Sequence, residues 1–439
     1  MKFKMNPITI GILGFLLVII LLMLGMPIAF LMMLVGFLGI WTLTSFETAL
    51  SVIAKNLYGV VSHYPYTIIP LFVLMGGLAG VGGITVQLYD TFDKWFRKLP
   101  GGLALATIGA CAGFAAISGS SVAAAAAMGN IALPEMRRFN YHPKLATGVI
   151  AAGGTLSFLI PPSLGFVVYG MLTEQSIGKL LIAGIIPGII LTLFYMVITV
   201  VRVMLNPSLA PKVASDTSWK EKLYALKGVW ETLLVFLVVI GGIYSGFITP
   251  TEAGAAGAFL LFLIIIFKRK AKIKGLLNAL FETVRISAMV LFLVAGANVF
   301  SYFLALSTIP FAISNWIVSL ELSRYAIFSI IIIIYLILGC FLDAISMMVL
   351  TLPVVFPLIL ALGFDPLWFG VTAVLMMEAG LITPPVGLNV YTLAGLVKDV
   401  PMEEIFKGAL PYLISILITL IILVMFPELA LFLPRSMMR

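Results

Sequence analysis

The chain has 439 residues, of which 62% are hydrophobic and only 10% are charged. A soluble protein of this length needs about 25% charged residues to cover its surface. A soluble enzyme, a nucleic-acid-binding protein and a disordered scaffold are therefore excluded. The remaining class is an all-α polytopic membrane protein, with room for about ten to twelve helical crossings of ~20 residues each. The net charge of +8 is attributed to membrane topology, because basic residues collect in cytoplasmic loops.

Motifs for chemistry are absent from the sequence. It contains no P-loop, no nucleophile elbow and no metal-ligand spacing. The chain is therefore expected to have no ATP-driven motor of its own and not to be an enzyme. Its two cysteines, Cys111 and Cys340, lie in apolar segments, where we expect them to pack as small hydrophobic side chains.

Apolar runs divide the chain into predicted membrane segments. They lie near residues 7–24, 27–44, 64–87, 145–172, 178–203, 228–247, 250–267, 276–306, 367–397 and 406–426. Two further runs, 99–134 and 325–364, are long for one crossing and short for two. Each has a polar or small break near its middle, at 118–121 and at 343–346. We predict two re-entrant hairpins, with one long tilted helix per run as the alternative.

The basic residues give a consistent topology when both runs are treated as hairpins. With the basic stretch 268–274 placed in the cytoplasm, eighteen of the 26 Lys and Arg residues fall inside and seven outside, and Arg285 lies within a span. This bias has the sign expected for cytoplasmic loops. Both termini are then predicted to lie outside. Lys2 and Lys4 do not fit this arrangement, because they would prefer the cytoplasm.

The second half of the sequence repeats the first at a shift near 223 residues. Prolines align at this shift, namely Pro134 with Pro357, Pro143 with Pro366, and Pro161-Pro162 with Pro384-Pro385. Chance alignment in proline-rich helices is the alternative. Each copy has three full crossings, and two spans separate the copies, so the second copy is predicted to be inverted. The predicted units are 1–44 (scaffold spans), 45–203 (repeat 1), 204–266 (linker and connecting spans), 267–426 (repeat 2) and 427–439 (a C-terminal tail).

Oxygen-rich segments at the hairpin tips and at the paired prolines are the candidate site. Two consecutive prolines break a helix and free backbone carbonyls, which suit Na⁺, while the N-termini of half-helices suit a carboxylate. One Na⁺ site is predicted from Ser118, Gly119, Ser120, Gly153, Thr155 and Pro161, and a second from Gly339, Asp343, Ser346, Gly380 and Thr383. Substrate contacts are predicted for Ser120, Ser121, Ser163, Arg285 and Asn389.

Two of these assignments have a plainer alternative. Asp343 could bond to backbone inside its hairpin instead of binding a cation. Arg285 could pair with Glu282, three residues earlier on the same helix, instead of holding a substrate carboxylate.

Several motifs together resemble the large, DctM-type membrane subunit of tripartite ATP-independent periplasmic (TRAP) transporters. They are Pro70–Gly76, the serine tip at 118–121 with the alanines after it, Ile160–Ser163, Pro250–Ala255, Gly339–Asp343 and Thr383–Gly387. The resemblance implies an elevator-type ion-transporter fold in the bacterial inner membrane. It also implies Na⁺-coupled import of a small organic acid, such as a sialic acid, a C4-dicarboxylate or a 2-oxoacid. The implied partners are a small four-helix membrane subunit, expected as a separate chain, and a soluble periplasmic binding protein. A stand-alone ion-coupled organic anion carrier is the alternative.

Overall fold

The computed structural model describes residues 6–212, 217–269 and 272–437, and every regular element in these ranges is helical. Six of the described helices are long and apolar enough to cross a membrane, or up to eight if each of two bent pairs is one span. This is fewer than the ten to twelve crossings expected from length. The first two apolar runs form helices of only 17 and 16 residues. The hairpins and one broken span are divided into shorter helices.

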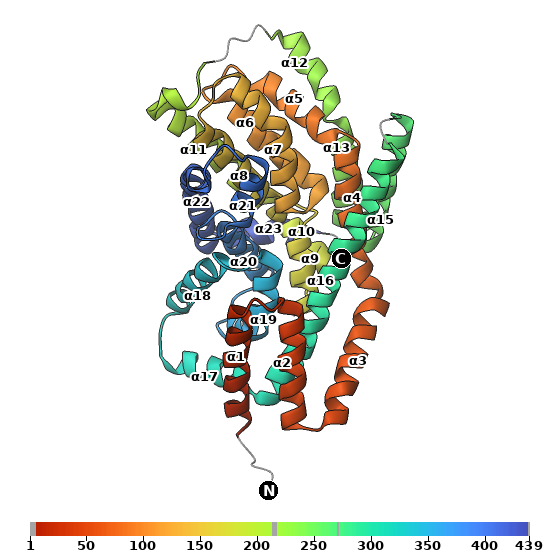
Figure 1. Ribbon diagram of the computed structural model, residues 1–439, viewed down its shortest axis with the longest axis vertical. Coiled ribbons are helices and arrows are strands. Elements are labelled where there is room, and N and C mark those ends of the chain that lie inside the picture. Colours follow the sequence, from red (N-terminus) through yellow and green to blue (C-terminus); the bar gives the residue numbers. More distant parts are fainter. Residues whose placement is uncertain (1–5, 213–216, 270–271, 438–439) are drawn as a thin grey trace.

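One layer of the molecule consists of long helices from the N-terminal part and the middle of the sequence. They are α1 (Pro7–Met23), α2 (Ile28–Leu43), α3 (Phe46–Ser62), α4 (Ile68–Val81), α15 (Pro250–Phe267) and α16 (Ile273–Ser307). The 35-residue α16 runs the length of this layer and packs along α2, α3 and α4 (Figure 1). Where α16 crosses α2, a Cβ added at Gly36 would lie 2.9 Å from a Val299 side-chain carbon, so only glycine permits this approach.

The second layer begins with a hairpin and a broken helix. Its elements are α5 (Ile84–Phe96), α6 (Gly102–Ser118), α7 (Ser121–Arg138), α8 (Pro143–Leu159), α9 (Leu164–Thr173), α10 (Ile177–Ala183) and α11 (Ile185–Leu205). Helices α6 and α7 pack against each other and join at Gly119 and Ser120. Helices α8 and α9 meet at an angle of 41° across the break that contains Pro161 and Pro162.

The second half of the chain repeats this order. Its elements are α17 (Ile309–Ser319), α18 (Arg324–Gly339), α19 (Ala344–Ala361), α20 (Pro366–Gly380), α21 (Leu388–Leu396) and α22 (Met402–Met425). Adding 223 to the bounds of α7 gives the bounds of α19. The peptide bonds Pro161-Pro162 and Pro384-Pro385 are both cis. The α6–α7 pair lies in the upper half of Figure 1 and the α18–α19 pair in the lower half.

The linker and the C-terminal segment form helices of their own. After residue 216 come α12 (Trp219–Ala225), α13 (Trp230–Phe236), a π-helical turn and α14 (Gly242–Tyr244). The stretch expected to be a tail forms α23 (Glu428–Ser436) instead. Ala430 and Leu431 are buried there because α23 packs against α10 and α20. The sequence missed this helix because its apolar face covers only a few positions.

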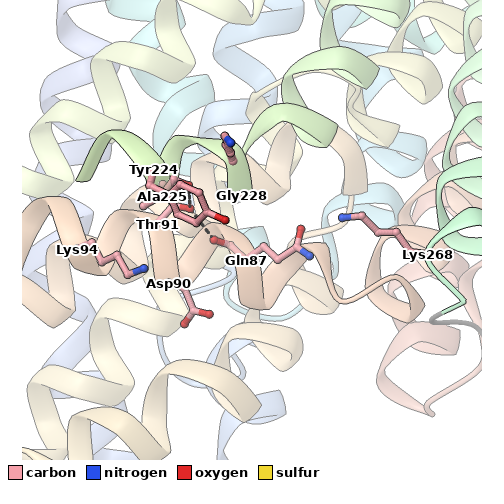
Figure 2. A pocket seen from close by; sticks show the side chains of 9 residues that line it. Gln87, Asp90, Thr91, Lys94, Tyr224, Ala225, Gly228 and Lys268 are labelled. Atoms are coloured by element: carbon pink, nitrogen blue, oxygen red, sulfur yellow. Dashed lines mark hydrogen bonds between the residues drawn. The ribbon is translucent and has the colours of Figure 1, made fainter. Parts of the chain in front are cut away.

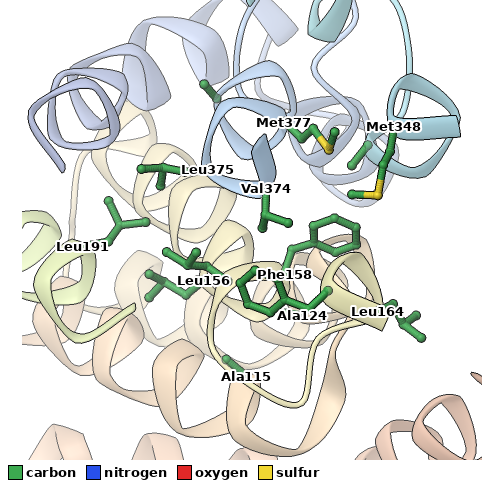
Figure 3. Close-up of a cluster of buried hydrophobic side chains, with 14 of the residues drawn as sticks. Ala115, Ala124, Leu156, Phe158, Leu164, Leu191, Met348, Val374, Leu375 and Met377 are labelled. Atoms are coloured by element: carbon green, nitrogen blue, oxygen red, sulfur yellow. The ribbon is translucent and has the colours of Figure 1, made fainter. Parts of the chain in front are cut away.

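The core lies where the two halves meet. In Figure 3, Leu156 and Phe158 of α8 lie between Ala115 of α6 and Val374 of α20, and all four are buried. The ion pair Arg137–Asp399, with contacts of 2.7 and 2.9 Å, joins the end of α7 to the loop after α21. These two segments therefore lie on the same face of the molecule, and Arg137 lowers the pKa of the Asp399 carboxyl below its usual range.

Helices α8 and α22 approach so closely that their contact needs glycine on both sides. A Cβ at Gly408 would overlap the Lys144 carbonyl oxygen, and a Cβ at Gly148 would overlap the backbone of Gly408. Small residues at such crossings let helix backbones touch in a membrane.

We expect Gly408→Ala to lower the free energy of unfolding by about 1–3 kcal/mol, because the added methyl group has no space. The matched control is Gly395→Ala in α21, where nothing lies within 4 Å of the added Cβ. It should be neutral or slightly stabilising. Thermal unfolding of the purified chain in detergent measures both, and an equal loss in the two variants would contradict this account of the crossing.

Candidate functional site

The tip of the first hairpin lies against the broken helix of its own half. Gly119 ends α6 with a φ of 65°, and a Cβ there would lie 2.7 Å from the Pro162 carbonyl oxygen. The Leu164 N–H donates to the Gly119 carbonyl oxygen at 3.4 Å. Ser120 then caps α7, with its Oγ accepting from the Ala123 N–H at 3.4 Å. The tip therefore needs glycine both for its left-handed backbone and for the close approach.

The second tip meets its own broken helix in the same way. A Cβ at Gly339 would lie 2.9 Å from the Gly380 Cα, so these two backbones touch. The Val386 N–H donates to the Cys340 carbonyl oxygen at 3.2 Å. Each hairpin is thus joined to the break of its own half through one carbonyl-to-amide contact.

Asp343 occupies the capping position of α19 that Ser120 occupies in α7. Its Oδ1 accepts hydrogen bonds from the N–H groups of Ile345 at 3.1 Å and Ser346 at 3.0 Å. The plainer interpretation of this carboxylate, a bond to its own hairpin backbone, therefore describes Oδ1. The second oxygen, Oδ2, takes part in neither bond. Asp343 is only partly buried and also lines a large cavity, so one oxygen is engaged and the side chain remains accessible.

Both tips line this cavity, which has a volume of about 1040 Å³. Ser120 and Ser121 come from the first tip, and Asp343 and Ser346 from the second. The opposite wall consists of the loop between α1 and α2 and one face of α16. The site is therefore enclosed by the two hairpins on one side and by the layer of long helices on the other.

A second cavity of about 370 Å³ shares Ser120 and Glu282 with the first and continues along α4 and α16. Its walls include small residues, namely Gly76, Gly77 and Gly80 on α4 and Ala123, Ala126 and Ala127 on α7, together with larger apolar side chains such as Phe114 and Ile286. It reaches Asn278, near the start of α16. Among the described lining residues of the two cavities, Glu282 and Asp343 are the charged ones, and none is Lys or Arg.

The structure separates the predicted substrate residues into two groups. Ser120 and Ser121 line the large cavity. Ser163 is fully buried and caps α9, while its Oγ donates to the Phe158 carbonyl oxygen. Asn389 is fully buried, and its Nδ2 donates to the Ala151 carbonyl oxygen at 3.0 Å. Arg285 lines neither cavity and forms no ion pair with Glu282.

The first predicted Na⁺ set is only partly assembled. Ser118, Gly119 and Ser120 form the tip, and the Pro161-Pro162 break lies beside it. Gly153 packs against Cys111 instead, because a Cβ there would lie 2.6 Å from the Cys111 sulfur. The Thr155 hydroxyl is turned toward α11, with contacts of 2.7 Å to the Ala152 carbonyl oxygen and 2.8 Å to the Tyr195 hydroxyl. The tip carbonyls and the break carbonyls are hard oxygen donors that fit Na⁺, whereas these last two residues do not approach them.

Part of the second predicted Na⁺ set lies together at Asp343. Ser346 lines the cavity beside the carboxylate, and Gly339 and Gly380 bring the tip and the break into contact. Thr383 lines neither cavity, and its hydroxyl donates to the Ala379 carbonyl oxygen of α20 at 2.6 Å. The Asp343 carboxylate, the Ser346 hydroxyl and the tip carbonyls are a donor set that suits a hard monovalent cation, so these groups fit Na⁺.

Two carboxylates at the site were not among the predicted residues. Glu378 is fully buried in α20, and its Oε1 accepts from the Ser121 hydroxyl at 2.9 Å, which joins the first hairpin to the second half. Its Oε2 has no partner among the described residues. Glu282 lines both cavities. Glu378 is a lone carboxylate in an apolar run, and that signal indicates a functional residue. Glu282 lies three residues before Arg285, so the sequence favoured an ion pair between the two.

Comparison with known proteins relates the whole chain to one group of transporters. Residues 15–429 match the family model described as "Tripartite ATP-independent periplasmic transporter, DctM component". A C4-dicarboxylate TRAP transporter large permease protein, DctM, of Pseudomonas aeruginosa is 38% identical over 87% of this chain and 89% of its own. A sialic acid TRAP transporter large permease protein, SiaM, of Vibrio cholerae is 32% identical over 94% of this chain and 96% of its own.

Among solved structures, the YdaH transporter of Alcanivorax borkumensis has a similar fold. The TM-score is 0.60 at 14% sequence identity, and the match covers 89% of this chain and 88% of that one. At this identity the likeness concerns the fold alone. It agrees with the predicted all-α membrane architecture with interrupted helices.

A substitution at the first tip tests this geometry directly. Gly119→Ala should lower the free energy of unfolding by about 1–3 kcal/mol, because the residue has a positive φ and touches the Pro162 carbonyl oxygen. Gly59→Ala is the control, since Gly59 lies in the helix α3 with nothing within 4 Å of an added Cβ. Thermal unfolding in detergent compares the two. A loss confined to Gly59→Ala, or none in either variant, would show that the tip does not depend on this contact.

Proposed function

Because the chain belongs to the DctM component family of tripartite ATP-independent periplasmic transporters, we propose that it imports a small organic acid together with Na⁺. The chain is a multi-pass protein of the bacterial inner membrane and a transporter subunit rather than an enzyme. The relatives named above carry C4-dicarboxylates and sialic acid by their names. A small carboxylate of this kind is the proposed cargo.

One observation is the basis for proposing that transport is coupled to Na⁺. The charged side chains that line the two cavities are the carboxylates of Glu282 and Asp343, and no described Lys or Arg faces them there. An organic anion that enters this space alone meets like charge in a medium of low dielectric constant, which disfavours its binding. A cation at the second tip, held by Asp343, Ser346 and the neighbouring carbonyls, removes that repulsion. Cation and anion therefore bind together.

An elevator movement is the proposed way in which the site crosses the membrane. The two hairpins and broken helices are tied to each other through tip contacts and through the Ser121–Glu378 hydrogen bond. They face α4 and α16 across a cavity whose lining includes glycines of α4 and alanines of α7. A surface of small side chains offers little interdigitation, which favours sliding of one rigid layer along another.

The proposed partners follow from the family name. A tripartite system places this chain beside two further components, which we propose to be a small four-helix membrane subunit and a soluble periplasmic binding protein. The binding protein would deliver the acid to the outer face of the membrane. A stand-alone ion-coupled anion carrier remains the competing proposal, because the enclosed cavity could in principle accept substrate directly from water.

Reconstitution separates these proposals. The chain is placed in liposomes together with a small TRAP membrane subunit from the same genome, and labelled succinate and sialic acid are offered with binding proteins for these acids. We expect uptake of one acid under an inward Na⁺ gradient, and no uptake when the small subunit or the binding protein is omitted. Equal uptake by the chain alone would favour the stand-alone carrier. Uptake that is unchanged when K⁺ replaces Na⁺ would contradict the coupling.

The carboxylate at the second tip has a matched control within the chain. Asp365 caps α20 as Asp343 caps α19, with its Oδ1 accepting from two backbone N–H groups at 2.8 and 3.2 Å, but it lines neither cavity. Asparagine caps helices about as well as aspartate. Asp343→Asn should therefore raise the Na⁺ concentration for half-maximal uptake by about tenfold or more. Asp365→Asn should leave it unchanged, and equal effects of the two variants would reject Asp343 as a Na⁺ ligand.

A further inference from the structure

A polar cavity lies away from the transport site, between α5 and the segment that follows α12. Its volume is about 260 Å³, and Figure 2 shows the side chains that surround it. Helix α5 contributes Gln87, Asp90, Thr91 and Lys94; the other walls are Tyr224, Ala225, Lys227, Gly228 and Lys268. It is smaller than a typical site for a drug-sized ligand, so it suits one compact polar group.

The cavity has a fixed floor. The Thr91 hydroxyl contacts the Gln87 carbonyl oxygen at 2.8 Å and the Ala225 carbonyl oxygen at 2.9 Å, which ties α5 to the end of α12. A Cβ at Gly228 would lie 2.6 Å from the Thr91 Oγ1, so the backbone passes directly over this side chain. The Trp95 Nε1 donates to the Lys222 carbonyl oxygen at 3.1 Å and holds the far end of α12. The walls are therefore set by the fold and do not depend on a ligand.

The charged side chains around the cavity differ in whether they form an ion pair. Lys268 forms an ion pair with the fully buried Glu231. Lys94 and Lys227 form no ion pair with a carboxylate in the described part of the chain. The Lys227 ammonium lies 4.8 Å from the centre of the Tyr224 ring, which places it at the wall. The cavity therefore offers two ammonium groups to an anion.

The cavity lies at the depth where the spans end. Lys268 directly follows Phe267, the last residue of the membrane-length helix α15. Helix α12 exposes Trp219, Leu223 and Tyr224, with exposed fractions of 72%, 59% and 67%, next to its lysines. Exposed aromatic and aliphatic side chains mixed with lysine are typical of a helix at the membrane interface. This face carries the excess of basic residues that the positive-inside rule assigns to the cytoplasm.

An apolar stretch continues from the polar cavity along the chain. A cavity of about 310 Å³ begins at Val229, the residue after Gly228, and follows α13 to Phe236. Its other walls come from α6 and α11 and are almost entirely aliphatic. A molecule with a polar group at Gly228 and hydrocarbon beyond it matches this order of environments.

We propose that this cavity binds the headgroup of an anionic phospholipid, as in phosphatidylglycerol. The phosphate lies between the ammonium groups of Lys94 and Lys227. The acyl chains lie against α13. Asp90 limits the affinity, because its carboxylate faces the same space as the phosphate. Basic pockets between helices at the cytoplasmic side are suited to such headgroups.

The test uses the purified full chain in a neutral detergent, titrated with dioctanoyl phosphatidylglycerol while the apparent Tm is followed. We expect the Tm to rise, and Lys94→Gln/Lys227→Gln to raise the half-saturating lipid concentration by about tenfold or more. The control Lys98→Gln/Lys220→Gln removes two exposed lysines from the same two segments outside the cavity and should shift it by less than about twofold. Asp90→Asn should tighten binding.

Three results would overturn the proposal. If both double variants weaken binding equally, the attraction is diffuse and no pocket is involved. If dioctanoyl phosphatidylcholine gives the same rise and the same response to the variants, the headgroup charge is not recognised. If inorganic phosphate produces the rise at the same concentrations, the site takes a free anion and not a lipid. None of these outcomes bears on the transport proposal, because the cavity shares no residue with the two cavities at the hairpin tips.

Discussion

The need to satisfy every backbone polar group within the membrane governs this structure. A chain that turns or breaks at membrane depth exposes carbonyls and N–H groups that hydrocarbon cannot satisfy. Here each hairpin tip and each helix break satisfy one another, through Gly119 with Leu164 and Cys340 with Val386. Glycines at the tips let the backbones come close enough. The same contact that makes the irregular backbone tolerable also gathers oxygen atoms, so the structural requirement and the proposed ion site share one cause.

The two halves of the chain share one backbone arrangement but differ in the side chains at equivalent positions. Ser120 and Asp343 take equivalent capping positions 223 residues apart, and both line the large cavity. A serine there leaves the first tip neutral, while an aspartate gives the second tip a charge. The helices behind the tips differ as well: α7 turns alanines toward α4, whereas α19 buries Met347 and Met348. The first copy thus presents small side chains to the smaller cavity, whereas the second copy places a charged residue at its tip.

Much of this arrangement can be predicted from features of this single sequence. Prolines in one register and charge-free runs with a central break predicted the fold class, and the break positions at Gly119 and Asp343 follow from them. Side-chain direction was beyond the sequence. Thr155 turns to Tyr195, and Asn389 turns to the Ala151 carbonyl oxygen. When a helix is apolar on every side, its sequence has no periodicity that indicates which face lines a cavity. For the same reason the sequence could not show that Arg285 lies outside both cavities.

The lining of the cavities also restricts where selectivity can arise. An acid that binds between Glu282 and Asp343 finds no described guanidinium or ammonium group to pair with. Its carboxylates can be held only by bound cations and by the N–H groups and hydroxyls at the starts of α7 and α19. Such donors recognise a carboxylate but read little of the molecule attached to it. In the proposed transport cycle, discrimination among acids therefore occurs before the acid reaches the membrane, at the proposed soluble binding protein.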